Sequence, residues 1–235
     1  MIDMLRTLLS ETPLWQFVAV AVVLVLMVLQ RDVLWRLVSR VALLGVWIGA
    51  ALLFTAAAIV TAEVLVRKAA GTIVGTSFVF SGSDEISGYL FAVGMSFSLA
   101  HVLVTKGHVR IDVLYAQFTP KTRAVMDLIA LFVMAIFVSS MLERAIDVAT
   151  TSYVEQIRSN TNLRIPLAWS QIPWAFGIGL FFVTILLAIF RSLAALLRGD
   201  FAAVNAIAGV STTEEEIEAE TKGLDVRGPT PRAEA

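Results

Sequence analysis

The chain has 235 residues, of which 58% are hydrophobic and only 16% are charged, with a formal net charge of −1. Soluble domains carry about 25% charged residues, so this composition favours an integral membrane protein. The charge balance provides no basic field for nucleic acid, and a chain without cysteine has no disulfide, thiolate metal site or cysteine nucleophile. Nothing in the sequence indicates an enzyme.

Five apolar segments follow one another along the chain. A membrane-spanning helix needs roughly 20 mostly apolar residues, and the last four segments have a plausible spanning length. The first is shorter, and it either spans a thinned bilayer or lies partly buried. We therefore predict an all-α fold, a polytopic membrane helix bundle with four core transmembrane helices and an extra N-terminal helix. The segments cover residues 14–29, 41–62, 86–104, 124–142 and 172–190.

Composition divides the chain into three parts. Residues 1–40 are an N-terminal extension with the short apolar helix, and residues 41–198 are the four-helix membrane domain. Residues 199–235 carry a run of glutamates and two late prolines, which predicts an acidic, mostly disordered cytoplasmic tail.

The cationic residues between the segments predict the orientation. Nine fall on one side of the membrane and five on the other, and the side with more is expected to be cytoplasmic. The C-terminus and the loop between the third and fourth segments are then cytoplasmic. The larger group comprises Arg31, Arg36, Arg40, Lys106, Arg110, Lys121, Arg123, Arg191 and Arg198, and the smaller comprises Arg67, Lys68, Arg144, Arg158 and Arg164.

Local signals predict where two of the helices begin. Ser83 is a good N-cap residue, and Asp84 and Glu85 would follow in the first turn, where the helix dipole favours anions. Pro173 is expected at the start of the last helix, a tolerated position, with Trp169 as an interface-anchoring aromatic at the same end.

His101 and His108 are the only histidines of the chain, and they raise the question of a haem. They lie seven residues apart, so on one helix they would share a face. Axial ligation of one haem by two histidines takes side chains from facing helices. We therefore favour an interfacial His101 and a loop His108, and we expect no cofactor and no metal site.

Charged residues of the fourth segment each allow two interpretations. Asp127 is either an intramembrane functional carboxylate or the partner of Arg123, four residues earlier, and we favour the ion pair. The group Glu143, Arg144 and Asp147 closes the segment on the external side. It is either a solvated helix end, which we favour, or a docking surface for an external partner.

The third segment is rich in small residues, which let neighbouring helices approach closely. Packing within this chain and packing against another subunit would look the same in the sequence. No segment has a proline or an unpaired charge at its centre, unlike the broken helices at which many transporters bind substrate, so we do not expect this chain to hold a substrate pathway alone. The small residues are Ser87, Gly88, Gly94, Ser96, Ser98 and Ala100.

Several short motifs, in this order and spacing, resemble a known family. Residues 84–89 open a helix with an acidic pair, and residues 106–114 follow it with a motif around His108 and Asp112. An apolar run ending in Arg67 lies upstream. Downstream, residues 161–169 approach the last helix through an Ile-Pro-X-X-Trp sequence. This pattern resembles the DctQ-type small membrane subunit of tripartite ATP-independent periplasmic (TRAP) transporters, over about residues 41–191.

The sequence departs from that family in two places. Segment 14–29 is an addition to the usual four spans, and the aromatic residue often found before the acidic pair is missing from residues 81–83.

The resemblance implies a non-catalytic subunit of the bacterial inner membrane. In such systems a periplasmic binding protein captures an organic acid, such as a C4-dicarboxylate, and a large permease subunit imports it with sodium. The small subunit would belong to the fixed scaffold and add a membrane-parallel amphipathic helix over residues 108–119, where Val109 and Val113 share a face. The family-motif residues are Arg67, Asp84, Glu85, Gly94, His108, Asp112, Pro166, Trp169 and Pro173, and the candidate partner contacts are Glu143, Arg144, Asp147 and Arg164.

Two other classes of protein stay open. A membrane anchor or assembly subunit of a respiratory complex would show haem absorbance. A self-sufficient small transporter would transport its substrate when reconstituted alone.

Overall fold

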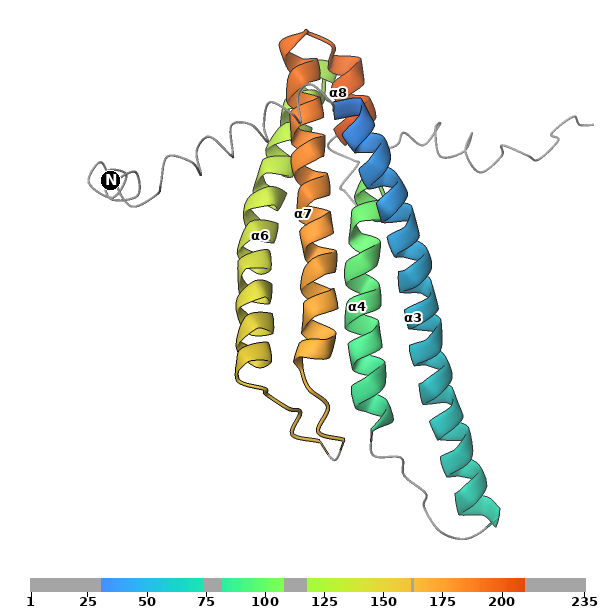
Figure 1. Ribbon diagram of the computed structural model, residues 1–235. Coiled ribbons are helices and arrows are strands. Elements are labelled where there is room, and N and C mark those ends of the chain that lie inside the picture. Colours follow the sequence, from blue (N-terminus) through green and yellow to red (C-terminus); the bar gives the residue numbers. More distant parts are fainter. Residues whose placement is uncertain (1–30, 74–81, 108–117, 162, 210–235) are drawn as a thin grey trace, which may run out of the picture.

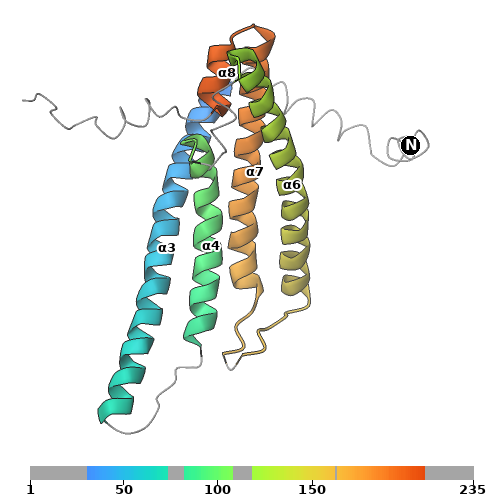
Figure 2. The same ribbon diagram turned by 180° about the vertical axis from the view of Figure 1, so that it is seen from behind.

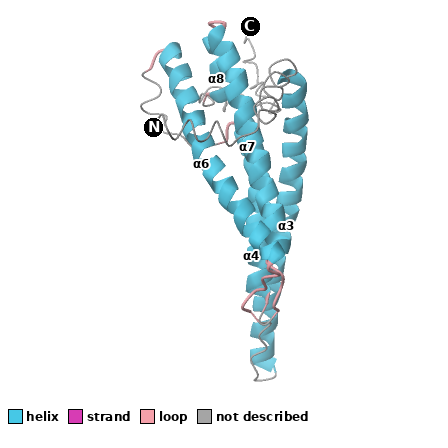
Figure 3. Ribbon diagram, turned by 60° about the vertical axis from the view of Figure 1, so that its left-hand side comes forward, coloured by secondary structure: helices cyan, strands magenta, loops and turns pink. Residues whose placement is uncertain are grey.

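The structure, a computed structural model, describes residues 31–73, 82–107, 118–161 and 163–209, and helices dominate these residues (Figure 3). Four of the helices are long and apolar enough to cross a membrane, so the predicted all-α membrane fold is confirmed. The N-terminal segment 14–29 and residues 108–117 of the predicted membrane-parallel helix lie outside the described residues. The helices are α3 (Arg31–Ile73), α4 (Ser83–Val104), α6 (Pro120–Val154), α7 (Ala168–Leu197) and α8 (Phe201–Ala208).

The four long helices lie side by side in the order α6, α7, α4, α3 (Figures 1 and 2). Each packs mainly on its neighbours in the row, and α3 also reaches α7, where the Arg191 guanidinium lies 4.8 Å from the centre of the Trp35 ring. We call the end of the row at which α4 and α7 begin the Glu85 end, and the opposite end the α8 end. A row buries little of each helix, and at most 44% of the residues in the most apolar stretch of any span are buried inside the chain.

The helices extend well past the apolar segments from which they were predicted. The 43 residues of α3 correspond to about 65 Å of helix, whereas the hydrocarbon core of a bilayer is about 30 Å thick. Helix α6 continues to Val154 because no glycine or proline interrupts it after Pro120. Glu143, Arg144 and Asp147 therefore lie inside α6, and the prediction that they close the helix is wrong.

Two predicted helix starts are also wrong in detail. Gly82, not Ser83, is the N-cap residue of α4, and Ser83 is the first helical residue; its hydroxyl donates to a carboxylate of α3 instead of capping its own helix. Asp84 and Glu85 do lie in the first turn, as predicted. Helix α7 begins at Ala168, which places Pro173 inside the helix. Proline there leaves the Trp169 carbonyl without its usual helical donor.

Close contact between backbones joins α4 to both of its neighbours. A Cβ added at Gly94 would lie 3.0 Å from the Gly49 carbonyl oxygen of α3, and one added at Gly177 of α7 would lie 2.7 Å from the Ser96 carbonyl carbon. Small residues at these positions let the helices approach to this distance. The small-residue face around Gly94 is thus used for packing within the chain.

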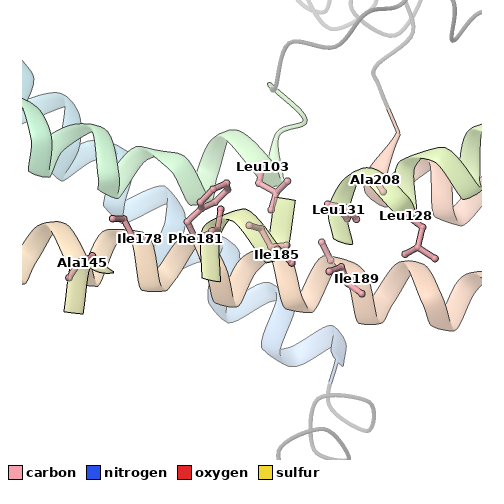
Figure 4. Packing of buried hydrophobic residues seen from close by; sticks show 13 residues of the cluster. Leu103, Leu128, Leu131, Ala145, Ile178, Phe181, Ile185, Ile189 and Ala208 are labelled. Carbon is pink, nitrogen blue, oxygen red and sulfur yellow. The ribbon is translucent and has the colours of Figure 1, made fainter. Parts of the chain in front are cut away.

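The main hydrophobic core lies along α7, which has a long neighbour on each side. Leu131 of α6 and Ile178 and Ile185 of α7 are almost completely buried, and Leu103 of α4 reaches the same cluster (Figure 4). At the α8 end, the short helix α8 packs against α6 and α7, with Val204 fully buried. Asp200 caps it by accepting a hydrogen bond from the Ala203 N–H at 2.9 Å.

Candidate functional site

Polar side chains of three different segments meet at the Glu85 end of the row. Glu63, near the C-terminal end of α3, accepts a hydrogen bond from the Ser83 hydroxyl and pairs with Arg67 one turn further along α3. The Glu63 side chain is only 9% exposed, and Ser83 is 1% exposed. A buried carboxylate is costly unless it is paired, so these contacts tie α3 to the start of α4.

Glu85 forms the second part of this polar cluster. The Tyr89 hydroxyl, one turn along α4, donates to one carboxylate oxygen at 2.6 Å, and the Thr161 hydroxyl donates to the other. Thr161 belongs to the connection between α6 and α7, and its hydroxyl lies 3.0 Å from that of Ser159. Glu85 therefore attaches this connection to α4.

The connection between α6 and α7 is a tight backbone hairpin. Its N–H groups at Ser159 and Leu167 donate across it to the carbonyls of Ile165 and Ile157, at 2.9 and 3.1 Å. Arg164 has a φ of 47°, a left-handed conformation that few residues other than glycine adopt. Such strain persists only where the surroundings hold it, and it is frequent at binding sites.

Cationic side chains point outward from this hairpin. Arg158 and Arg164 are both exposed, and the Arg158 guanidinium donates to the Arg164 carbonyl at 3.4 Å. On the last turns of α6, Arg144 and Asp147 form an ion pair at 3.5 Å in which both side chains are more than two-thirds exposed. Exposed pairs of this kind contribute little to stability, so both side chains remain available to a partner.

The predicted family-motif residues do not form one cluster. Glu85 meets the hairpin, which contains Pro166, whereas Asp84 faces a groove between α3 and α4. Trp169 and Pro173 line a separate groove with Tyr89 on the α4–α7 side. Gly94 is buried against α3, and His108 and Asp112 lie outside the described residues.

No group of three or more His, Asp or Glu side chains in the described part of the chain is arranged to hold a metal ion. His101 is half-buried near the end of α4, and its Nδ1 atom has no hydrogen-bond partner among the described residues.

Asp127 is 2% exposed and lies one turn from Ala124 and from Leu131, on the stripe of α6 that packs against α7 and α8. The Arg123 side chain donates to the Phe118 carbonyl at 3.0 Å, at the start of α6. Asp127 therefore belongs to the packing of the α8 end and not to an exposed surface.

Sequence reasoning missed the central role of Glu63. Its spacing of four residues from Arg67 could have indicated an ion pair on α3. No local signal indicated that it meets Ser83, because that contact depends on how α3 and α4 pack. Gly88 was recognised only as one of several small residues, whereas it lines the groove between α3 and α4 that Asp84 faces.

Comparison with known protein families identifies the chain. Residues 56–195 match the family described as "Tripartite ATP-independent periplasmic transporters, DctQ component". This chain belongs to the DctQ family. It is thus a small subunit of a TRAP transporter, a multi-pass membrane protein of a family that works with a large permease and a periplasmic binding protein. No curated protein and no solved structure matched the chain.

The DctQ match begins inside α3 and ends near the end of α7. It includes Glu63, Ser83 and Glu85, and it includes the whole α6–α7 hairpin. The first half of α3 and helix α8 lie outside it, so the Glu85 end belongs entirely to the part of the chain that defines the family.

Proposed function

We propose that this DctQ protein is the fixed scaffold subunit that supports a large permease during sodium-coupled import of an organic acid. The arrangement of the four spans in a row is the observation that carries this proposal. A row leaves both broad faces of the helices uncovered, and fewer than half of the residues in the most apolar stretch of each span are buried. Such a surface suits a chain that packs side by side with a larger membrane partner.

The described spans offer little to bind a polar substrate. Their buried polar side chains in the described region are few, and Thr184, near the middle of α7, already donates to its own helix at 2.7 Å. Substrate specificity would therefore lie in the binding protein and the large subunit. The family makes a carboxylate such as a C4-dicarboxylate the expected substrate class.

The Glu85 end would face the periplasm, and the α8 end would face the cytoplasm of the bacterial cell. The cationic residues support this orientation in the part of the chain that the structure describes. Eight of them lie towards the α8 end, from Arg31 to Arg198, and five lie towards the Glu85 end. An excess of Lys and Arg marks the cytoplasmic side of membrane proteins. The C-terminus would then be cytoplasmic.

The α6–α7 hairpin and the last turns of α6 would contact the periplasmic binding protein. The hairpin donates a hydrogen bond to Glu85 through Thr161, and Arg158 and Arg164 are exposed on it. Glu143, Arg144 and Asp147 line the neighbouring part of α6 with exposed charges. A preformed, charged surface lowers the ordering cost of docking and steers the approach of a soluble partner.

Reconstitution in proteoliposomes tests the proposal. Sodium-driven uptake of a radiolabelled carboxylate should require this chain, the large subunit and the binding protein together. Vesicles with this chain alone should show no uptake above the background of protein-free vesicles. Uptake by this chain alone would instead establish a self-sufficient small transporter.

A further inference from the structure

A groove of about 820 Å³ opens between α3 and α4 near the Glu85 end. Its wall on α4 runs from Asp84 to Phe91, which is about 10 Å along the helix axis. Small residues, Ala56 and Ala57 on α3 and Gly88 on α4, line it together with the larger Leu53 and Phe91. We call it the Gly88 groove.

No close contact within the described part of the chain explains why residue 88 is a glycine. A Cβ added there would meet no atom within 4 Å, whereas one added at Gly49, Gly94 or Gly177 would press on a neighbouring helix. Close helix contact thus explains Gly49, Gly94 and Gly177, whereas Gly179 of α7 meets only the Leu142 side chain at an ordinary 3.8 Å. At Gly88 the missing side chain leaves room for a group from outside the chain to approach the α4 backbone.

Asp84 places a negative charge at the mouth of the Gly88 groove. The three acidic side chains at this end differ in their contacts: Glu63 holds Ser83 and Arg67, and Glu85 holds Tyr89 and Thr161. The exposed Asp84 carboxylate has no hydrogen bond or ion pair with any described residue. A carboxylate beside an apolar groove at the membrane edge is stabilised by a cation brought by the occupant.

A second groove on the row provides a contrast. It lies between α6 and α7 and has a volume of about 490 Å³. Large apolar side chains such as Phe176 and Phe182 line it together with the small Ala175 and Gly179. No charged or hydroxyl side chain lines it. Lipid tails adapt to such a surface without any special residue, so this groove needs no protein partner.

We propose that the Gly88 groove binds a transmembrane helix of the large permease subunit, and that this helix carries a Lys or Arg opposite Asp84. The inference rests on the proposed function and specifies which surface of the chain carries the partner. A lipid tail carries no cation to place opposite Asp84. A second copy bound symmetrically through the same groove would bring one Asp84 towards another, and like charges at an interface are unfavourable.

Site-specific photo-crosslinking in membranes that contain the complete transporter tests the proposal. The chain has no native cysteine, so Gly88→Cys can carry a single maleimide-linked benzophenone, with Gly179→Cys in the α6–α7 groove as the matched control. An adduct of this chain with the large subunit is expected from Gly88→Cys and not from Gly179→Cys. A dimer of this chain, lipid adducts alone, or equal subunit adducts from both sites would overturn the proposal.

Co-purification of the two subunits adds a second measurement. Gly88→Leu fills open space, so the variant should fold normally and yet recover about tenfold less large subunit. Asp84→Lys should have a similar effect, and Asp84→Glu should retain the partner. Normal recovery with Gly88→Leu and Asp84→Lys would refute the groove while leaving the proposed function intact. Failure of the unmodified chain to recover the large subunit would refute both.

Discussion

The Ser83 hydroxyl at the start of α4 donates a hydrogen bond to the Glu63 carboxylate of α3, twenty residues earlier in the chain. Both side chains are buried or nearly so, and the same carboxylate also holds Arg67. The contact ties the start of α4 to α3 beside the Gly88 groove.

The Ser83–Glu63 contact should stabilise the fold. Ser83→Ala leaves a buried carboxylate with one donor fewer, which should lower the free energy of unfolding by about 1–3 kcal/mol. Thermal denaturation of the purified protein in detergent measures the change. Ser87→Ala is the control, because among the described residues the Ser87 hydroxyl donates to the Asp84 carbonyl of its own helix and should matter little. Equal shifts for the two variants would contradict the assigned role.

The Glu85–Thr161 contact should hold the α6–α7 hairpin. Thr161→Val removes the donor with little change in volume, so amide hydrogens of residues 157–167 should exchange faster while those of α7 stay protected. Hydrogen–deuterium exchange with mass spectrometry measures this. Arg144→Gln should leave the exchange of the hairpin unchanged, since its ion pair with Asp147 is exposed. Unchanged exchange in Thr161→Val would show that Glu85 does not anchor the hairpin.

Arg164 should contribute to function more than to stability. Its left-handed backbone suits glycine, so the free energy of unfolding of Arg164→Gly should lie within about 1 kcal/mol of that of the original protein. Uptake by the complete transporter should nevertheless fall if the exposed guanidinium meets the binding protein. Gln156→Gly is the matched control, because Gln156 has a φ of 52° in the same connection. Equal uptake by both variants would remove Arg164 from the docking surface.

The α4–α7 contact should not tolerate a side chain at Gly177. A Cβ there would lie 2.7 Å from the Ser96 carbonyl carbon, and overpacking of this kind typically costs about 1–3 kcal/mol. Gly177→Ala should therefore lower the denaturation temperature clearly. Gly179→Ala meets only the Leu142 side chain, at an ordinary 3.8 Å, and should leave that temperature almost unchanged. The reverse order would mean that α4 and α7 do not approach as described.

The orientation can be tested with single cysteines in the cysteine-free chain. Asn160→Cys lies on the exposed hairpin, and Ala202→Cys lies on the exposed side of α8. A membrane-impermeant thiol reagent should label Asn160→Cys in intact spheroplasts and Ala202→Cys only after the membrane is opened. The opposite pattern would invert the proposed topology.

The sequence was sufficient to predict the spans because apolar runs of this length are typical of membrane-spanning helices and not of soluble proteins. It was less informative about helix ends. Polar residues such as Glu143 and Arg144 do not stop a helix, and the uninterrupted sequence of α6 carries it on to Val154. Ser83 shows a related limit. Its side chain is of a type that often caps helices, but its hydroxyl donates to a carboxylate of α3 instead.

The candidate site depended on packing, which the sequence does not show. Gly88 and Gly94 lie on the same helix, six residues apart, and both were recognised as small. Only the contact with Gly49 shows that Gly94 packs within the chain. The orientation of the spans, the roles of the motif residues and the extent of the N-terminal helix stay predictions.

The order of the helices has a mechanical consequence. In a closed ring every helix keeps one neighbour when the other is lost, whereas α6 at the edge of this row packs mainly on α7 among the described long helices. The chain is two helix pairs joined mainly along the seam between α4 and α7, at which Gly177 meets Ser96, with a smaller contact between α3 and α7. A pulling force or a detergent that opens this seam would separate α3–α4 from α6–α7 with each pair still intact.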